Sequence, residues 1–210
     1  TVISRSGPDN YENLHRHSDA AILVNATPVG MYPKAGQSPV DLDRLPQLEA
    51  VLDIVYNPTR TRLILDAQAR GIPCESGLLM LVAQAVRASE IFTGQSIPEE
   101  TLSRVVAAVA RDMENVTLIG MPGAGKTTVG RILAQTLGRE FVDCDEVLVQ
   151  RAGMPIPDYF AQFGEDAFRQ LETALLWELG QKSRLVLATG GGCVTRPENR
   201  DLLRQNGTVV

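Results

Sequence analysis

The glycine-rich segment GMPGAGKT at residues 120–127 constrains the fold of this 210-residue chain more than any other feature. It has the spacing G-x-x-x-x-G-K-[ST], follows the apolar residues 116–119 and precedes a stretch with helical periodicity. A strand, a glycine loop and a helix in this order form a phosphate-binding loop, in which backbone N–H groups and the helix N-terminus surround phosphate oxygens. We therefore expect an α/β fold that binds a nucleotide phosphate.

Lys126 and Thr127 are the two side chains of this loop that carry chemistry. The lysine is expected to reach the β- and γ-phosphates of a nucleotide, and the threonine hydroxyl is expected to ligate Mg²⁺. Lys126 is one of only three lysines in the chain. The expected phosphate-binding residues are Gly120, Gly123, Ala124, Gly125, Lys126, Thr127 and Thr128.

Short apolar runs alternate with helical stretches along the rest of the chain, which favours parallel sheets flanked by helices. The expected strands are residues 1–4, 21–25, 51–55, 116–119, 140–143 and 185–188, and GTVV at 207–210 reads as the opening of another. The expected helices are residues 59–70, 78–92, 99–113, 126–137, 167–179 and 197–205. Because a fresh strand and the glycine loop follow the amphipathic helix 99–113, the expected domains are residues 1–114 and 115–210.

The composition excludes several classes of protein. A formal net charge of −5 without a basic run argues against nucleic-acid binding, and no apolar stretch approaches the roughly 18 residues of a membrane span. Cys74, Cys144 and Cys193 fit neither a disulfide framework nor a zinc site, which favours the cytoplasm. We expect no nucleic-acid, membrane or protein partner. The chain starts without Met and stops within an expected strand, so we expect it to be a piece of a longer protein.

Asp143 and Asp145 lie two residues apart at the end of the expected strand 140–143. In a strand these positions share a face, and the carboxyl ends of strands are where α/β sheets bind ligands. One carboxylate could support Mg²⁺, and the other could accept a hydrogen bond from a substrate hydroxyl. The alternative is that they cap the helical residues that follow.

Two further elements complete the pattern in this half. Gly190, Gly191 and Gly192 follow an apolar strand and allow a backbone to approach a ligand closely, although a flexible turn would have the same composition. Arg169 could hold a carboxylate in a two-pronged pair, with Glu172 on the same helix face to orient it. The alternative for this pair is an ordinary surface salt bridge.

The four segments GMPGAGKTT, FVDCDE, AFRQLE and ATGGG together resemble shikimate kinase, from about residue 115 to residue 210. The resemblance implies a small P-loop kinase with a five-stranded parallel sheet, which transfers the γ-phosphoryl of ATP to the 3-hydroxyl of shikimate. It implies that Lys126, Asp145 and Arg169 are catalytic and that Thr127 and Asp143 support Mg²⁺. The implied shikimate-binding residues are Asp145, Arg169, Gly190, Gly191 and Gly192. In the family a lid with an arginine, a further substrate-binding arginine and an adenine-binding loop come after this part.

The motifs in residues 1–114 are less specific than those in residues 115–210. SRS at residues 4–6 ends an expected strand and suits the 2′-phosphate of a dinucleotide, although a surface arginine in a turn would look the same. NATPVGM at 25–31 and DIVYNP at 53–58 are turns that follow strands. Gln84 is polar within an apolar helix, so it is either hydrogen-bonded in the core, which the pattern alone favours, or it faces a ligand.

These motifs, with TRLILDAQARG, GLLMLVAQA and FTG, resemble the NADP-binding domain of shikimate dehydrogenase. The resemblance implies that NADP(H) binds along Ser4, Arg5, Ser6, Thr27, Ile54 and Gly77. It also implies that Tyr56 and Gln84 face shikimate. SRS replaces a more usual Asn-Arg-Thr, so the 2′-phosphate assignment depends on Arg5. The family's pyrophosphate loop and catalytic Lys–Asp pair have no counterpart in these residues.

The two resemblances are to enzymes of consecutive steps, so we expect a bifunctional shikimate dehydrogenase–shikimate kinase. The expected fold is a partial Rossmann-like NADP-binding domain followed by a partial P-loop kinase domain, and the 210 residues alone are expected to catalyse neither reaction. One alternative is another small-molecule P-loop kinase joined to a Rossmann-like domain. A second alternative is a noncatalytic nucleotide-binding module.

Overall fold

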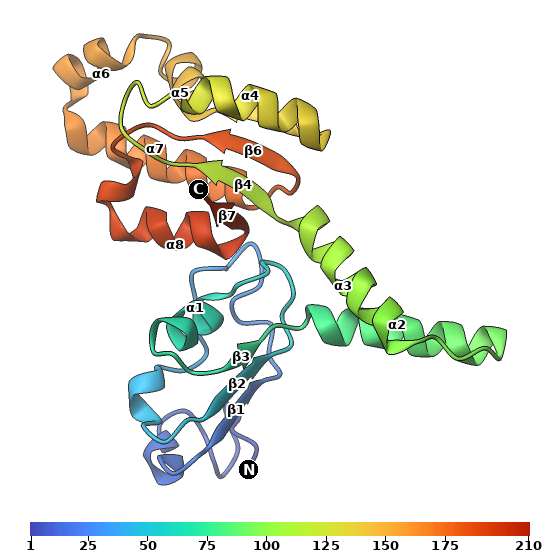
Figure 1. Ribbon diagram of the computed structural model, residues 1–210. Helices are drawn as coiled ribbons and strands as arrows, with labels where there is room; N and C mark the ends of the chain where they lie inside the picture. The colour runs from blue at the N-terminus through green and yellow to red at the C-terminus, as the bar shows by residue number, and fades with distance from the viewer. The chain divides into compact units, whose positions relative to one another are not determined.

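The computed structural model describes all of residues 1–210, which form two compact units, Thr1–Ala108 and Val109–Val210 (Figure 1). Each unit is built around its own sheet, and every pairing between strands is parallel. The expected α/β class, with parallel sheets flanked by helices, is thereby confirmed. The boundary between the units lies inside one helix, whereas the assignment of two domains at 1–114 and 115–210 stays a prediction.

The sheet of the first unit has the order β1-β2-β3. Its strands are β1 (Ile22–Asn25), β2 (Ala50–Asp53) and β3 (Cys74–Glu75), with short 3₁₀ turns at Leu14–His17 and Leu42–Arg44. Helix α1 (Arg62–Ala69) packs on β2 and β3 and encloses a core of Leu42, Val51, Leu63 and Ala67. Because alternate strand residues face opposite sides, this packing buries Asn25 and Asp53 at the carboxyl ends of β1 and β2.

Helices α2 (Leu78–Thr93) and α3 (Glu99–Met113) follow the first sheet. The last turn of α3 belongs to the second unit, where Arg139 donates hydrogen bonds to the Arg111 and Glu114 carbonyl oxygens at 2.6 and 3.0 Å. Arg184 pairs with Asp112 at 2.7 Å. Carbonyl groups at a helix C-terminus lack partners within the helix, so the Arg139 guanidinium satisfies them and complements the helix dipole.

The sheet of the second unit has the order β5-β6-β4-β7. Its strands are β4 (Asn115–Leu118), β5 (Glu140–Asp143), β6 (Leu185–Ala188) and β7 (Gly207–Val209). Its helices are α4 (Lys126–Leu137), α5 (Cys144–Ala152), α6 (Ile156–Phe163), α7 (Glu165–Gly180) and α8 (Pro197–Gln205), with a 3₁₀ turn at Cys193–Thr195.

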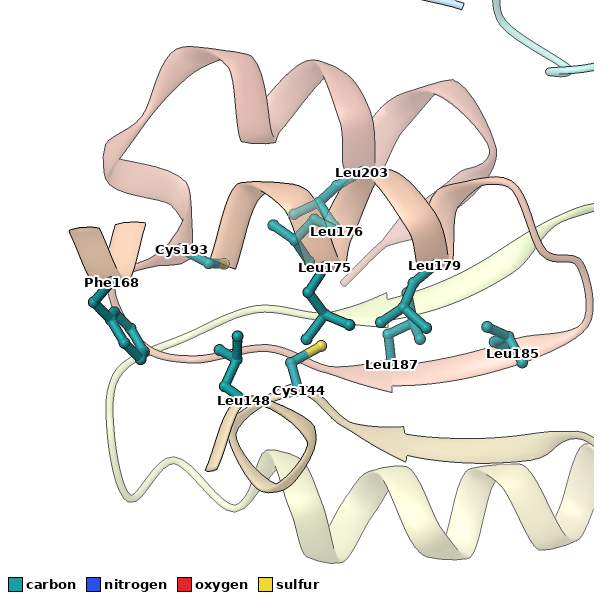
Figure 2. Packing of buried hydrophobic residues seen from close by; sticks show 10 residues of the cluster. All are labelled: Cys144, Leu148, Phe168, Leu175, Leu176, Leu179, Leu185, Leu187, Cys193 and Leu203. Atoms are coloured by element: carbon teal, nitrogen blue, oxygen red, sulfur yellow. The ribbon is translucent and has the colours of Figure 1, made fainter. Parts of the chain in front are cut away.

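The core of the second unit lies between α7 and the sheet (Figure 2). Leu175, Leu176 and Leu179 of α7 pack in one cluster with Leu185 and Leu187 of β6. The remaining buried members are Cys144, Leu148, Phe168, Cys193 and Leu203. Burying side chains of this size is the main stabilising contribution to such a unit, at about 1.5–3 kcal/mol each. The cluster therefore fixes α7 and α5 relative to the end of β6, where the candidate site lies.

The structure differs from the expected elements at several places. Residues 1–4 form no strand, because Ser4 has only a single bridge to Asn10. The two-residue strand β3 and the helices α5 and α6 were not expected. The helix expected from residue 59 starts at Arg62, because the Thr61 hydroxyl caps it by accepting a hydrogen bond from the Ile64 N–H.

None of the helices combines the length and the apolar composition that crossing a membrane requires.

Candidate active site

The loop between β4 and α4 has the backbone conformation that its glycines allow. Gly120, Gly123 and Gly125 have φ values of 148°, 77° and 82°, a region that residues with a Cβ rarely adopt. Gly125 is also the N-cap of α4, so the helix starts directly at Lys126. The loop thus places a helix N-terminus beside exposed backbone, the arrangement that binds phosphate.

Lys126 lies across this loop. Its Nζ donates hydrogen bonds to the carbonyl oxygens of Gly120 and Met121, both at 2.8 Å. These contacts hold the ammonium group at the mouth of the loop rather than in bulk solvent. A phosphate bound in the loop would therefore meet a positive charge that is already in place.

Thr127 and Asp143 bring two oxygen atoms together at the carboxyl ends of β4 and β5. The Thr127 hydroxyl donates to Asp143 Oδ2 at 2.7 Å. Mg²⁺ prefers oxygen ligands, so this pair fits it. No group of three or more His, Cys, Asp or Glu side chains is arranged to hold a metal ion. The remaining ligands of Mg²⁺ at this pair would come from phosphate and water.

Asp143 and Asp145 do not share a strand face, contrary to expectation. Asp143 ends β5 and caps α5, with its Oδ1 accepting from the N–H groups of Asp145 and Glu146 at 3.1 and 3.4 Å. The capping alternative therefore holds for Asp143, which also accepts from Thr127. Asp145 lies in the first turn of α5, half-buried. Burial and the neighbouring Asp143 raise the pKa of Asp145, while Lys126 and Arg169 work against this shift.

Arg169 is held by two carboxylates on its own helix. Its Nη1 donates to Glu172 Oε2 at 2.9 Å, and its Nη2 donates to Glu165 Oε1 at 3.1 Å. Glu172 is only 1% exposed, so the pair is not an ordinary surface salt bridge. Burial disfavours the charge on Arg169, but the bonds to Glu172 and Glu165 outweigh it and raise the pKa of the guanidinium. Burial likewise raises the pKa of Glu172, whose Oε1 has no hydrogen-bond partner.

The glycine turn after β6 packs directly against these groups. A Cβ on Gly190 would lie 2.7 Å from Asp145 Oδ1 and 3.1 Å from Glu172 Oε1, and a Cβ on Gly192 would collide with the Arg169 guanidinium. A Cβ on Gly191 would lie 2.5 Å from Pro122 of the phosphate-binding loop. The structure therefore brings the predicted residues together in one place: phosphate loop, Asp145, Arg169 and glycine turn.

Sequence reasoning missed two residues that join these parts. Thr189 is buried, and its hydroxyl donates to the Leu118 carbonyl oxygen at 3.0 Å, which ties the end of β6 to the end of β4. Pro122 fills the space that Gly191 leaves open. The only sequence signal for either residue is its place next to a glycine motif. Thr128, which is expected to bind phosphate, is exposed at the start of α4, and its contact with phosphate stays a prediction.

If Arg169 binds shikimate, as the sequence predicts, Gly192→Ala should weaken that binding, because the new methyl group must displace the Arg169 guanidinium. Losing a charge-assisted hydrogen bond of about 1.5–3 kcal/mol would raise the KM for shikimate by roughly 10- to 100-fold. Steady-state kinetics of the full-length protein would measure this, with Gly36→Ala as control because a Cβ there meets nothing within 4 Å. An unchanged KM for shikimate would show that the turn does not set the position of Arg169.

The predicted 2′-phosphate residues lie in a tight turn of the first unit. The Ser4 hydroxyl accepts from the Gly7 N–H at 2.9 Å, so this hydroxyl is already engaged in the turn. Arg5 and Ser6 are exposed, and the Arg5 guanidinium makes no hydrogen bond or ion pair within the chain. Arg5 is thus a cation that a ligand phosphate could reach.

Thr27, Ile54 and Gly77 meet at the carboxyl ends of β1 and β2. The Thr27 hydroxyl donates to Asn25 Oδ1 at 2.7 Å, and the Ile54 N–H donates to the Asn25 carbonyl oxygen at 3.0 Å. Gly77 packs so tightly on Ile54 that a Cβ would collide with the Ile54 carbonyl group. No hydrogen bond links these three residues to the turn at Ser4–Ser6.

Tyr56 and Gln84 were expected to face shikimate in the first unit. Tyr56 is 40% exposed and follows the end of β2. Gln84 is exposed on α2, so the interpretation of Gln84 as a hydrogen-bonded core residue is wrong. Exposure leaves both side chains accessible to a ligand, and their contact with shikimate stays a prediction.

Comparison with known proteins finds relatives of the second unit. Residues 122–210 match the sequence model of the family described as shikimate kinase. The shikimate kinase of Burkholderia lata is 52% identical over 102 residues, which are 48% of this chain and 55% of that protein. The chain thus spans about half the length of the curated relatives it matches. The second unit is therefore similar to part of shikimate kinase.

Similar solved structures include a shikimate kinase and a shikimate dehydrogenase. Shikimate kinase from Acinetobacter baumannii in complex with shikimate is 48% identical, with a TM-score of 0.46, over 49% of this chain and 57% of that one. Shikimate dehydrogenase 1 from Peptoclostridium difficile is 32% identical, with a TM-score of 0.47, over 51% of this chain and 44% of that one. Both TM-scores are below 0.5, so neither establishes a common fold.

Proposed function

We propose that the second unit supplies the phosphate-binding and shikimate-binding parts of a kinase that transfers the γ-phosphoryl of ATP to the 3-hydroxyl of shikimate. The observation that carries this proposal is the packing of the glycine turn against Asp145, Arg169 and the phosphate-binding loop. A hydroxylated carboxylate lying against this turn would meet an acceptor for its hydroxyl group and a cation for its carboxylate. Its hydroxyl group would also lie beside the loop that holds the phosphates.

Each side chain has a separate task in this proposal. Asp145 accepts the proton of the attacking hydroxyl group, and Arg169 binds the substrate carboxylate while Glu172 and Glu165 keep the guanidinium oriented. Lys126 and the loop N–H groups stabilise the charge on the transferring phosphoryl group. Thr127 and Asp143 would hold Mg²⁺, which neutralises phosphate charge when bound.

A panel of substrates tests this assignment against the two alternatives. The full-length protein should consume ATP with shikimate, and should not do so with nucleoside monophosphates or with shikimate that lacks its carboxylate. Turnover of a nucleoside monophosphate would favour another P-loop kinase. Nucleotide binding without transfer to any acceptor would favour a noncatalytic module.

We further propose that the first unit belongs to an NADPH-dependent shikimate dehydrogenase in the same polypeptide. Two features support this proposal: the uncommitted guanidinium of Arg5 beside a tight turn, and the convergence of Thr27, Ile54 and Gly77 at the ends of two parallel strands. Parallel sheets of this class bind dinucleotides at the carboxyl ends of their strands. The three cysteines are free, which agrees with the proposed cytoplasmic location.

We expect Arg5→Ala to weaken the binding of NADPH much more than that of NADH, because only NADPH carries the 2′-phosphate. Losing one charge-assisted hydrogen bond of about 1.5–3 kcal/mol corresponds to a rise of roughly 10- to 100-fold in the KM for NADPH. Dehydrogenase kinetics of the full-length protein with both cofactors would measure this. Arg16→Ala removes another exposed guanidinium of this unit and serves as the control. Equal weakening of both cofactors would remove Arg5 from the phosphate site.

A further inference from the structure

The first unit contains a buried polar cluster that neither resemblance assigns. Its members are Asn25, Asp53 and Thr61, which are 4%, 2% and 1% exposed. Asn25 and Asp53 are partners in the register of β1 and β2, and both stand at the carboxyl ends of their strands. Burying a carboxylate is costly unless it is well hydrogen-bonded. The hydrogen-bond partners of Asp53 therefore show what its burial serves.

Asp53 accepts three hydrogen bonds from three different segments. Its Oδ1 accepts from Asn25 Nδ2 at 2.9 Å and from the Val55 N–H at 3.0 Å. Its Oδ2 accepts from the Thr61 hydroxyl at 2.6 Å. One carboxylate therefore joins the end of β1, the loop after β2 and the start of α1.

The same contacts extend to the residues expected to lie along the dinucleotide. Asn25 Oδ1 accepts from both the N–H and the hydroxyl of Thr27, at 3.1 and 2.7 Å. On the other side, the Val55 carbonyl oxygen accepts from the Gly77 N–H at 3.1 Å. Ile54 lies between Asp53 and Val55, the two residues joined by the Val55 N–H bond. Thr27 and Gly77 are thus connected to Asp53 by hydrogen bonds through Asn25 and Val55, and Ile54 is the next residue along the chain.

We propose that Asp53 is a positioning residue for dinucleotide binding: it holds the loops of Thr27, Ile54 and Gly77 in the conformation that receives the cofactor. This inference rests on the proposed dehydrogenase function. Because a loop that is ordered before binding loses less entropy on binding, the carboxylate lowers the cost of binding without touching the ligand. No hydrogen bond connects Asp53 or its partners to the turn of Arg5, so we expect its effect to be the same with and without the 2′-phosphate.

The test compares three variants of the full-length protein. Asp53→Leu removes all three acceptor contacts, and we expect roughly tenfold higher KM values for NADPH and for NADH alike. Asp53→Asn keeps an acceptor for Asn25 and Val55 and presents an amide to the Thr61 hydroxyl, so it should restore both KM values to within about threefold. Leu63→Ala destabilises the same unit through its apolar core and removes none of the hydrogen bonds of Asp53, so it should lower the melting temperature without changing either KM.

Amide hydrogen exchange of the 210-residue chain adds a readout that requires no activity. Asp53→Leu should lose protection at the N–H groups of Thr27, Val55 and Gly77, and Leu63→Ala should not lose it selectively there. Unchanged KM values in Asp53→Leu, with normal dehydrogenase activity in the unmodified protein, would overturn the positioning role alone. An unmodified protein that turns over neither cofactor would overturn the dehydrogenase proposal, and the positioning role with it.

Discussion

Replacing Lys126 by alanine should reduce the kinase turnover of the full-length protein by about 10³-fold or more, the scale of losing a preorganised charge at a transferring phosphoryl group. The ammonium group already lies over the phosphate loop, 2.8 Å from two of its carbonyl oxygens. Without it, the developing negative charge would be stabilised only by backbone N–H groups. Dehydrogenase turnover should not change, because the residues proposed for that activity belong to the other unit.

The control for this experiment is Lys182→Ala. Lys182 is an exposed lysine of the same unit, in the turn between α7 and β6, and its loss should leave both activities unchanged. Coupled assays of the two reactions, run on the same preparations, would provide the comparison. Normal kinase turnover in the Lys126→Ala variant would show that the loop does not act on a transferring phosphoryl group.

Replacing Asp145 by asparagine should reduce kinase turnover by roughly 10²–10⁴-fold, the usual contribution of a general base. Asparagine keeps the shape of the side chain but cannot accept the proton of the substrate hydroxyl group. Asp158→Asn changes an exposed carboxylate on α6 and is the matched control.

The pH profile gives a second test of Asp145. Burial and Asp143 raise its pKa, so the side chain takes up its proton at a higher pH than an ordinary aspartate, whose pKa is about 3.9. Only the ionised form can act as a base. The kcat/KM for shikimate should therefore fall, as pH decreases, at a pH above that ordinary value. The Asp145→Asn variant should lack this acidic limb. If the Asp145→Asn variant kept both its turnover and the acidic limb of the pH profile, another group would be the proton acceptor.

The sequence was most informative where one motif dictates backbone and chemistry together. The glycine spacing at 120–125 predicted the loop, and helix α4 starts and ends at the expected residues. Strands β5 and β6 also have their expected bounds, although only β6 is fully buried and β5 lies at the edge of the sheet. The glycines at 190–192 were expected to let the backbone approach a ligand. The structure packs them closely against Asp145 and Arg169, and their contact with a ligand stays a prediction.

Other features depend on contacts that a sequence does not display. Asp145 was placed on a strand because α5 follows β5 without any linker, and only the capping bonds of Asp143 reveal the change. The burial of Glu172 depends on the packing of α7 against the sheet, so charge alone suggested a surface pair. The cluster at Asp53 joins residues 25, 53 and 61, which become neighbours only through the parallel pairing of β1 and β2.

The central claim is that this chain contributes to phosphorylation of the shikimate 3-hydroxyl group. Its most direct test is to incubate the full-length protein with ATP, Mg²⁺ and shikimate, and to identify the product by phosphorus–proton correlation in NMR. We predict one phosphorylated product, in which phosphorus couples to the proton on carbon 3, and no product with the Lys126→Ala variant. Phosphorylation of another hydroxyl group of shikimate, or hydrolysis of ATP without any phosphorylated shikimate, would contradict the account.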